Sequence, residues 1–418
     1  MFIGDNNIKS LSVAELPVKK IFKGEELIFS KNMEHMQFEG QTSGYISLAN
    51  NFFVSGKNST GQLGIGGTSN SNVFLKAGEK VKSFHQSTDT TAFVASNGDL
   101  YIAGSGGQGQ QGNGSSSNVL TFTKRANNVK KVFCTSYETF YIDSNKNLYG
   151  CGQNKYSSLG MGNTSPYYSF VKLASNVEDI SASPEKAIYL SSNGDVFTAG
   201  RREMGTGSGT TSGNETYWKH VASQAVKILS LQRDSFYLDS NGILYGTGYN
   251  FYGSLGLGNT ANHPSFTKIA ENVRDFGQAE HVSWFIDNNN NLYMCGLNNY
   301  GQQSNGTTNN VTVFTKRAEN VKHCIATPRT FWYVNFNNEL FGCGGNDFGQ
   351  QGDGTLINVS QFTKRADDVK MFGGSFINTW YMTSSGKVFG CGHNASGQLG
   401  LGSFDSPITS FVELDIKE

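Results

Sequence analysis

The segment "ILYGTGYNFYGSLGLGN" (residues 243–259) has counterparts along the chain, such as "NLYGCGQNKYSSLGMGN" (147–163) and "ELFGCGGNDFGQQGDGT" (339–355). Its central glycine, Gly248, belongs to a series of glycines spaced 48 residues apart. A fixed period of this length is typical of stacked supersecondary units. We therefore expect a repeated scaffold with structural anchor glycines at Gly56, Gly104, Gly152, Gly200, Gly248, Gly296, Gly344 and Gly392.

Within each repeat, apolar and polar residues alternate with the period of β-strands. In one repeat, "VKKVF" (129–133), "FYID" (140–143) and "LYGCG" (148–152) are separated by turn residues. A fourth run, "FTKRA" (122–126), follows the Gly-rich loop of the preceding repeat. The pattern predicts one small, four-stranded antiparallel sheet per repeat.

Such a sheet is too small to be stable by itself, and radial stacking of sheets covers both of its faces. Large aromatic residues stand 12 residues before several anchors, and we expect them to pack between sheets; the tryptophans among them are Trp284, Trp332 and Trp380. The predicted fold is therefore all-β: a closed β-propeller of 48-residue blades, with eight blades expected and seven as the alternative.

The two ends of the repeat region predict how the ring closes. Residues 33–55 resemble the last half of a repeat, and residues 392–414 resemble the first half. We expect these halves to share one blade, which would remove the free sheet edges. The predicted domains are a short β-rich segment (1–32) and the propeller (33–418).

Composition counts against several classes of function. Lys plus Arg and Asp plus Glu both number 33, so the basic surplus of a typical nucleic-acid binder is absent. We find no apolar run long enough to span a membrane and no signal peptide, which predicts cytoplasmic synthesis, with a virion as a destination if the protein is viral. No catalytic constellation, metal site or cofactor motif is present, so we expect a protein that is not an enzyme.

The motif G-x-N-x-x-G-Q-L-G-x-G, clearest at 56–66 and 392–402, resembles the regulator of chromosome condensation repeat family. The resemblance covers about residues 33–418 and implies a β-propeller whose loop face binds another protein. Members of that family include a nucleotide exchange factor for a small nuclear GTPase and a secreted bacterial β-lactamase inhibitor. The histidine usual in eukaryotic members is missing before the second strand, so exchange-factor activity is not transferred to any residue here.

The segment "VKKIFKGEELIFS" (18–30) lies outside the repeats and reads as a short hairpin. It is similar to leader segments of structural and surface proteins from gut bacteria and their phages. This similarity implies a phage or bacterial source, and we expect residues 1–32 to be where the protein could assemble into a larger complex.

Positions that vary between repeats are free to serve a partner. The asparagine two residues after most anchors, such as Asn154, is expected to form a left-handed turn. Around it, charged and aromatic residues on a rigid rim are favourable for interface hot spots. The alternative is that they are solvated turns with half-buried rings. The candidate partner-binding residues are Lys155, Tyr156, Arg201, Arg202, Tyr249, Phe251, Tyr252, Tyr300, Asp347, Phe348 and His393.

Three functions remain open. The first is a non-enzymatic propeller that binds a protein or glycan, as a phage or bacterial structural or surface-recognition component. The second is a regulator of a partner enzyme or GTPase, of the exchange-factor or inhibitor type, acting through the loop face. The third is an enzyme, which ionisable residues converging on the central channel would favour.

Overall fold

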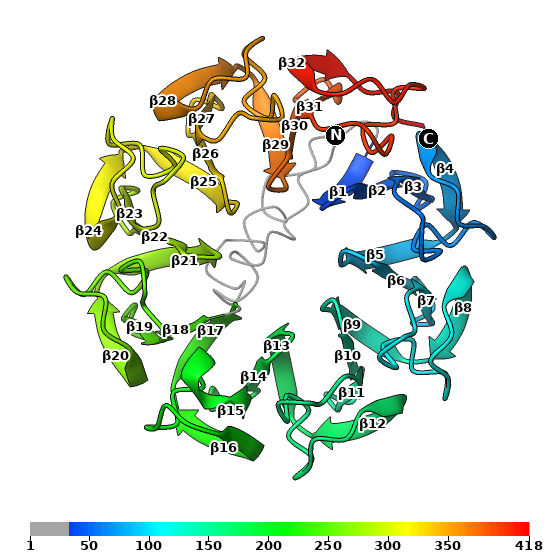
Figure 1. The fold of residues 1–418 in the computed structure, drawn as a ribbon, viewed down its shortest axis with the longest axis vertical. Coiled ribbons are helices and arrows are strands. Elements are labelled where there is room, and N and C mark those ends of the chain that lie inside the picture. Colours follow the sequence, from blue (N-terminus) through cyan, green and yellow to red (C-terminus); the bar gives the residue numbers. More distant parts are fainter. Residues whose placement is uncertain (1–32, 232, 418) are drawn as a thin grey trace, which may run out of the picture.

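The computed structural model describes residues 33–231 and 233–417, which form a closed ring of eight four-stranded antiparallel sheets (Figure 1). This confirms the predicted all-β propeller and its eight blades. Within the described residues, the only helical element is one short 3-10 helix, η2 (Arg202–Met204). None of these residues belongs to a helix that could cross a membrane. The predicted hairpin at 18–30 lies outside the described residues.

Each blade is built from four consecutive strands. Blade 1 contains β1 (Met33–Glu39), β2 (Thr42–Ser47), β3 (Phe52–Gly56) and β4 (Ser71–Gly78). Blade 2 contains β5 (Val81–Gln86), β6 (Thr90–Ala95), β7 (Leu100–Gly104) and β8 (Val119–Ala126). Blade 3 contains β9 (Val129–Cys134), β10 (Glu138–Asp143), β11 (Leu148–Gly152) and β12 (Tyr167–Ala174). Blade 4 contains β13 (Val177–Ser183), β14 (Lys186–Ser191), β15 (Val196–Arg201) and β16 (Asn214–Ala222).

The second half of the ring repeats this order, with the first strand of each blade nearest the axis (Figure 1). Blade 5 contains β17 (Ala225–Ser230), β18 (Asp234–Asp239), β19 (Leu244–Gly248) and β20 (His263–Ala270). Blade 6 contains β21 (Val273–Ala279), β22 (Val282–Asp287), β23 (Leu292–Gly296) and β24 (Val311–Ala318). Blade 7 contains β25 (Val321–Ala326), β26 (Thr330–Asn335), β27 (Leu340–Gly344) and β28 (Val359–Ala366), and blade 8 contains β29 (Val369–Gly374), β30 (Asn378–Thr383), β31 (Val388–Gly392) and β32 (Ile408–Glu413).

An aromatic triad stabilises every blade. In blade 3, Tyr141 stacks on its cross-strand partner Tyr149 with ring centroids 4.7 Å apart, and Phe170 of the outer strand meets it edge-on at 4.9 Å. Such stacked and edge-on pairs contribute about 0.5–1.5 kcal/mol each beyond the area that they bury. The same three-ring arrangement recurs in all eight blades.

The loop between the third and fourth strands of each blade reaches the outer strand of the next blade. In blade 5, the backbone N–H of Gly258 donates to the carbonyl oxygen of Thr312 in blade 6 at 2.8 Å. We call this interaction the clasp. It joins all eight pairs of neighbouring blades through Gly66–Leu120, Gly114–Tyr168, Gly162–Thr216, Gly209–Pro264, Gly258–Thr312, Gly306–Ser360, Gly354–Thr409 and Gly402–Asn72.

The expectation that residues 33–55 and 392–414 share one blade is wrong. β1–β4 and β29–β32 each form a complete sheet from consecutive residues. The period counted between anchor glycines does not mark the blade boundary, because each anchor ends the third strand of a blade. Gly56 ends β3, the third strand of blade 1, and β4 completes that blade. Gly392 ends β31, and β32 completes blade 8, so the first and the last blade are each built from their own consecutive strands.

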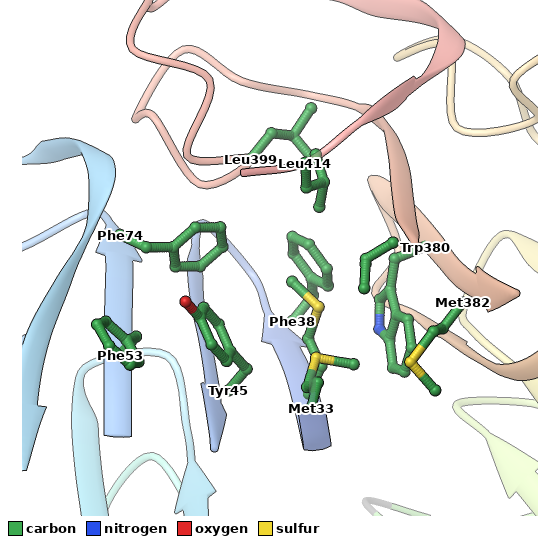
Figure 2. Close-up of a cluster of buried hydrophobic side chains, with 11 residues drawn as sticks. Met33, Phe38, Tyr45, Phe53, Phe74, Trp380, Met382, Leu399 and Leu414 are labelled. Atoms are coloured by element: carbon green, nitrogen blue, oxygen red, sulfur yellow. The ribbon is translucent and has the colours of Figure 1, made fainter. Parts of the chain in front are cut away.

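Blades 1 and 8 are joined by packing and by loop contacts. Met33 and Phe38 of β1 and Tyr45 of β2 face Trp380 and Met382 of β30 in a buried apolar cluster (Figure 2). The eighth clasp, from Gly402 to Asn72, lies at the same junction. In addition, the Ser55 hydroxyl donates to the carbonyl of Gln398 at 3.2 Å, and the Lys417 N–H donates to the Tyr45 hydroxyl at 2.7 Å.

Candidate functional site

The long loops between the third and fourth strands share one face of the ring with the turns between the first and second strands. Because the strands of each blade alternate in direction, the turn between strands one and two and the loop between strands three and four emerge on the same side. We call this side the loop face. All the candidate partner-binding residues predicted from the sequence lie in its long loops, or at the end of the strand that leads into one.

Buried asparagines hold the long loops in shape. Asn58 is fully buried; its Nδ2 donates to the carbonyl of Gly67 at 2.8 Å, and its Oδ1 accepts from the N–H of Leu63 at 2.9 Å. Equivalent bonds are made by Asn154, Asn250, Asn298, Asn346 and Asn394. Of these six, only Asn250 has positive φ, so the expected left-handed turn is wrong for most of them. Their role is to satisfy loop backbone groups away from water.

One predicted group lies between blades 3 and 4. The Tyr156 ring is covered by the guanidinium of Arg201 at 5.3 Å and by the ammonium of Lys155 at 5.3 Å, both measured to the ring centroid. Arg201 also pairs with Glu185 at 3.0 Å. Arg202 has a structural contact instead: its Nε donates to Glu215 at 2.6 Å and holds the divergent fourth loop against β16.

A second group, the Phe251 cluster, consists of Tyr249, Phe251, Tyr252, Arg233 and His281. Phe251 is 55% exposed and packs edge-on against Tyr252, with centroids 4.8 Å apart. The Arg233 guanidinium lies over the Tyr249 ring at 5.0 Å, and Tyr252 packs on the His281 ring at 4.7 Å. The cluster presents rigid aromatic surface beside a cation, which is the composition favoured at interface hot spots.

A third group, the Arg329 cluster, contains Tyr300, Phe348 and Phe376 around a single guanidinium. The distances from Arg329 to these ring centroids are 4.8, 5.5 and 5.8 Å. Arg329 also donates to the carboxylate of Asp347 at 3.1 Å. His393 closes one side, 5.6 Å from the Phe348 ring, and burial lowers the pKa of its imidazole.

The sequence interpretation missed Arg233, Arg329 and Phe376. All three lie in turns between the first and second strands, which vary in sequence from blade to blade. Arg233 and Arg329 nevertheless occupy the same repeat position two blades apart. An arginine at the same position of two repeats is the sequence signal that could have identified these two residues, since both turns open on the loop face beside an aromatic residue.

The aromatic residues are unevenly distributed on the loop face. The fourth residue after the anchor is aromatic in blades 3, 5, 6 and 7, as Tyr156, Tyr252, Tyr300 and Phe348. In the other four blades it is Thr60, Gln108, Met204 and Ser396. The face therefore has an aromatic arc, mainly on blades 5 to 7 with Phe376 of blade 8 beside it, and a polar sector on blades 1 and 2, whose loops on this face contain no aromatic residue.

A pocket of about 310 Å³ opens beside the Arg329 cluster. Its walls come from blades 6, 7 and 8, and they are Glu280, Leu297, Asn299, Tyr300, Pro328, Arg329 and Phe376. This volume is at the lower end of the range for ligand pockets and suits one large side chain better than a cofactor.

Ionisable residues also line the inner strands, but they pair across neighbouring blades. Lys227 of β17 lies 2.5 Å from the carboxylate of Asp275 on β21, and Lys131 of β9 pairs with Asp179 of β13. Within residues 33–231 and 233–417, no cluster of His, Cys, Asp or Glu is arranged to hold a metal ion. The six cysteines are free and buried, and burial raises the pKa of the Cys134 thiol to about 12.

Beneath the loop face, three adjacent blades begin their second strand with a buried ionisable residue: Glu138, Lys186 and Asp234. Lys186 donates to the Ser235 hydroxyl at 2.7 Å, and no carboxylate among the described residues lies within salt-bridge distance of it. Desolvation lowers the pKa of Lys186 to about 7 and raises the pKa of Glu138 to about 8.

We expect Lys186 to make stability depend on pH. Its pKa is about 7 in the folded protein and about 10.5 when unfolded, so between these values the unfolded chain binds more protons. The free energy of unfolding contributed by Lys186 therefore rises with pH from about 7 to 10.5. We expect Lys186→Met to remove this rise. The measurement is the free energy of unfolding in urea at pH 7 to 9.5, taken as the difference between wild type and variant, and this difference should increase with pH. A difference that stays constant over that range would contradict the assignment.

The chain matches no protein-family model and no curated protein. Among solved structures it is similar to human WBSCR16, with a TM-score of 0.60 and 16% identity over 76% of this chain and 93% of that one. It is also similar to yeast RCC1 (Prp20) bound to Kap60, with a TM-score of 0.59 and 17% identity over 77% of this chain and 84% of that one. A structure of Prp20p from Saccharomyces cerevisiae, described with its binding to Gsp1p and histones, matches at a TM-score of 0.57 and 16% identity over 78% and 88%.

These likenesses show the fold: the chain is a β-propeller similar in architecture to these three structures. The resemblance predicted from the G-x-N-x-x-G-Q-L-G-x-G motif is confirmed at the level of the fold.

Proposed function

We propose that the protein is a non-enzymatic regulator that binds a partner protein through the aromatic arc of its loop face. The observation that carries this proposal is the pair of clusters that combine aromatic rings with an arginine, the Phe251 cluster and the Arg329 cluster, on neighbouring blades of the ring. Aromatic and arginine side chains dominate binding energy in protein interfaces, whereas the polar sector on blades 1 and 2 lacks them.

The similar propellers support a protein partner. Yeast Prp20 is described in complex with Kap60 and as a binder of Gsp1p and histones. At 16–17% sequence identity these structures support a protein as the kind of partner, but they do not indicate which protein it is. None of the three structures described above favours the alternatives of a glycan ligand or a phage structural component.

We expect simultaneous replacement of Tyr249, Phe251 and Tyr252 by alanine to abolish partner binding while leaving the fold intact. Phe251 is exposed and Tyr249 and Tyr252 are half-buried in the same loop, outside the core between blades. Hot-spot truncations cost about 2 kcal/mol or more each. The partner would first be identified by photocrosslinking from position 251 in source cells, and the affinity of the purified pair would then be measured by calorimetry.

The matched control is the triple variant Ser59→Ala, Thr60→Ala and Gln108→Ala on the polar sector of the same face. It removes side chains from the equivalent loops of blades 1 and 2 and is expected to bind like wild type. If the aromatic variant keeps both its circular dichroism spectrum and its affinity, this face is not the binding surface.

A further inference from the structure

The pocket beside the Arg329 cluster carries an unbalanced negative charge. Two charged side chains line it, Glu280 and Arg329. The guanidinium of Arg329 is neutralised by Asp347 at 3.1 Å and covered by three aromatic rings. The side chain of Glu280 is exposed, and among the described residues no cation lies within salt-bridge distance of it.

Glu280 also occupies a backbone conformation that favours glycine. It is the first residue of the two-residue turn between β21 and β22, with φ of +48°. The equivalent turn of blade 1 places Gly40 there, with φ of +58°. A left-handed conformation costs a glutamate free energy that a glycine does not lose. Strain of this kind at the edge of a pocket points to a role for the side chain.

The remaining walls suit the stem of a long cationic side chain. Leu297, Pro328, Tyr300 and Phe376 provide apolar and aromatic surface next to the carboxylate of Glu280. An ammonium or guanidinium group that enters this space can pair with the carboxylate and lie against an aromatic face.

We propose that this pocket receives a lysine or arginine side chain of the partner protein, with Glu280 as its counter-ion. The inference rests on the proposed function and adds which class of partner side chain, a cationic one, the loop face binds. The polar rim of an interface commonly supplies such selectivity through charge complementarity.

The test uses a library of random linear peptides selected on the full-length protein and depleted on the Tyr300→Ala/Phe376→Ala variant. We expect the enriched peptides to share a lysine or arginine next to an apolar residue. A synthetic peptide of the enriched sequence should bind Glu280→Gln at least about tenfold more weakly than wild type, because that variant loses the charge and keeps the shape. Glu319→Gln, on the opposite face, should bind the peptide like wild type.

Glu280→Gly separates the two roles of this position. It should bind the peptide as weakly as Glu280→Gln and unfold at a higher urea concentration than wild type, because the strain is relieved. An acidic consensus, the absence of any enriched sequence, or unchanged affinity of Glu280→Gln would overturn the proposal. If the Tyr249, Phe251 and Tyr252 variant loses the natural partner while Glu280→Gln keeps it, only the pocket inference fails.

Discussion

Gly248→Val should lower the free energy of unfolding by about 2–6 kcal/mol or prevent folding altogether. The φ of Gly248 is +138°, a region that costs a branched residue about 1–3 kcal/mol. A Cβ atom there would lie 2.3 Å from the carbonyl oxygen of Arg233 and 2.7 Å from the Cα of Asp234. Both contacts are backbone atoms, one in the turn before β18 and one at its first residue, so relief needs a backbone shift, which adds about 1–3 kcal/mol.

The measurement is urea unfolding followed by circular dichroism. The control is Asn309→Ala, at an exposed loop position, which should change stability by less than about 0.5 kcal/mol. If Gly248→Val unfolds at the same urea concentration as this control, the anchor glycines do not set the strand-to-loop junction.

Trp332→Ala should destabilise the protein by about 3–5 kcal/mol, the usual cost of deleting a fully buried large aromatic side chain. Trp332 is 0% exposed and packs with Val334, Leu340 and Val369 in the core between blades 7 and 8. Its indole N–H donates to the Thr330 hydroxyl at 2.9 Å, so truncation also leaves that hydroxyl with one partner fewer.

Tyr217→Ala is the matched control for this effect, because Tyr217 is 68% exposed on the outer strand of blade 4. Calorimetric and urea unfolding should show a loss below about 1 kcal/mol for it. A loss of that size for Trp332→Ala would mean that the core between blades does not depend on this ring.

The scaffold could be predicted from the sequence because its determinants repeat. The eight anchors all have φ between +101° and +138°, and Trp284, Trp332 and Trp380 are all buried between blades as expected. The boundary between blades could not be predicted in the same way. An interval counted from Gly56 to Gly104 has the same length wherever the blade begins, so the period contains no information about its starting point.

The candidate site was only partly predictable, for a related reason. Loop aromatics such as Tyr300 and Phe348 share a repeat position, so they could be recognised from the sequence alone. Arg329 becomes significant only when the ring places its turn between those loops. The importance of Glu280 follows from its backbone φ and from a pocket whose walls come from three blades. The importance of Lys186 follows from its burial, and the periodic sequence pattern indicates none of these properties.

The clasp between Gly402 and Asn72 also bears on the order in which the ring assembles during synthesis. Seven junctions connect neighbours about 54 residues apart, so each can form soon after its second blade leaves the ribosome. The last junction joins residues such as Ser55 and Gln398, which are 343 positions apart, and it must wait for nearly the whole chain. Until then, the apolar faces of blade 1 and of the newest blade remain open to water, and this nascent arc is the species most exposed to aggregation and to capture by chaperones.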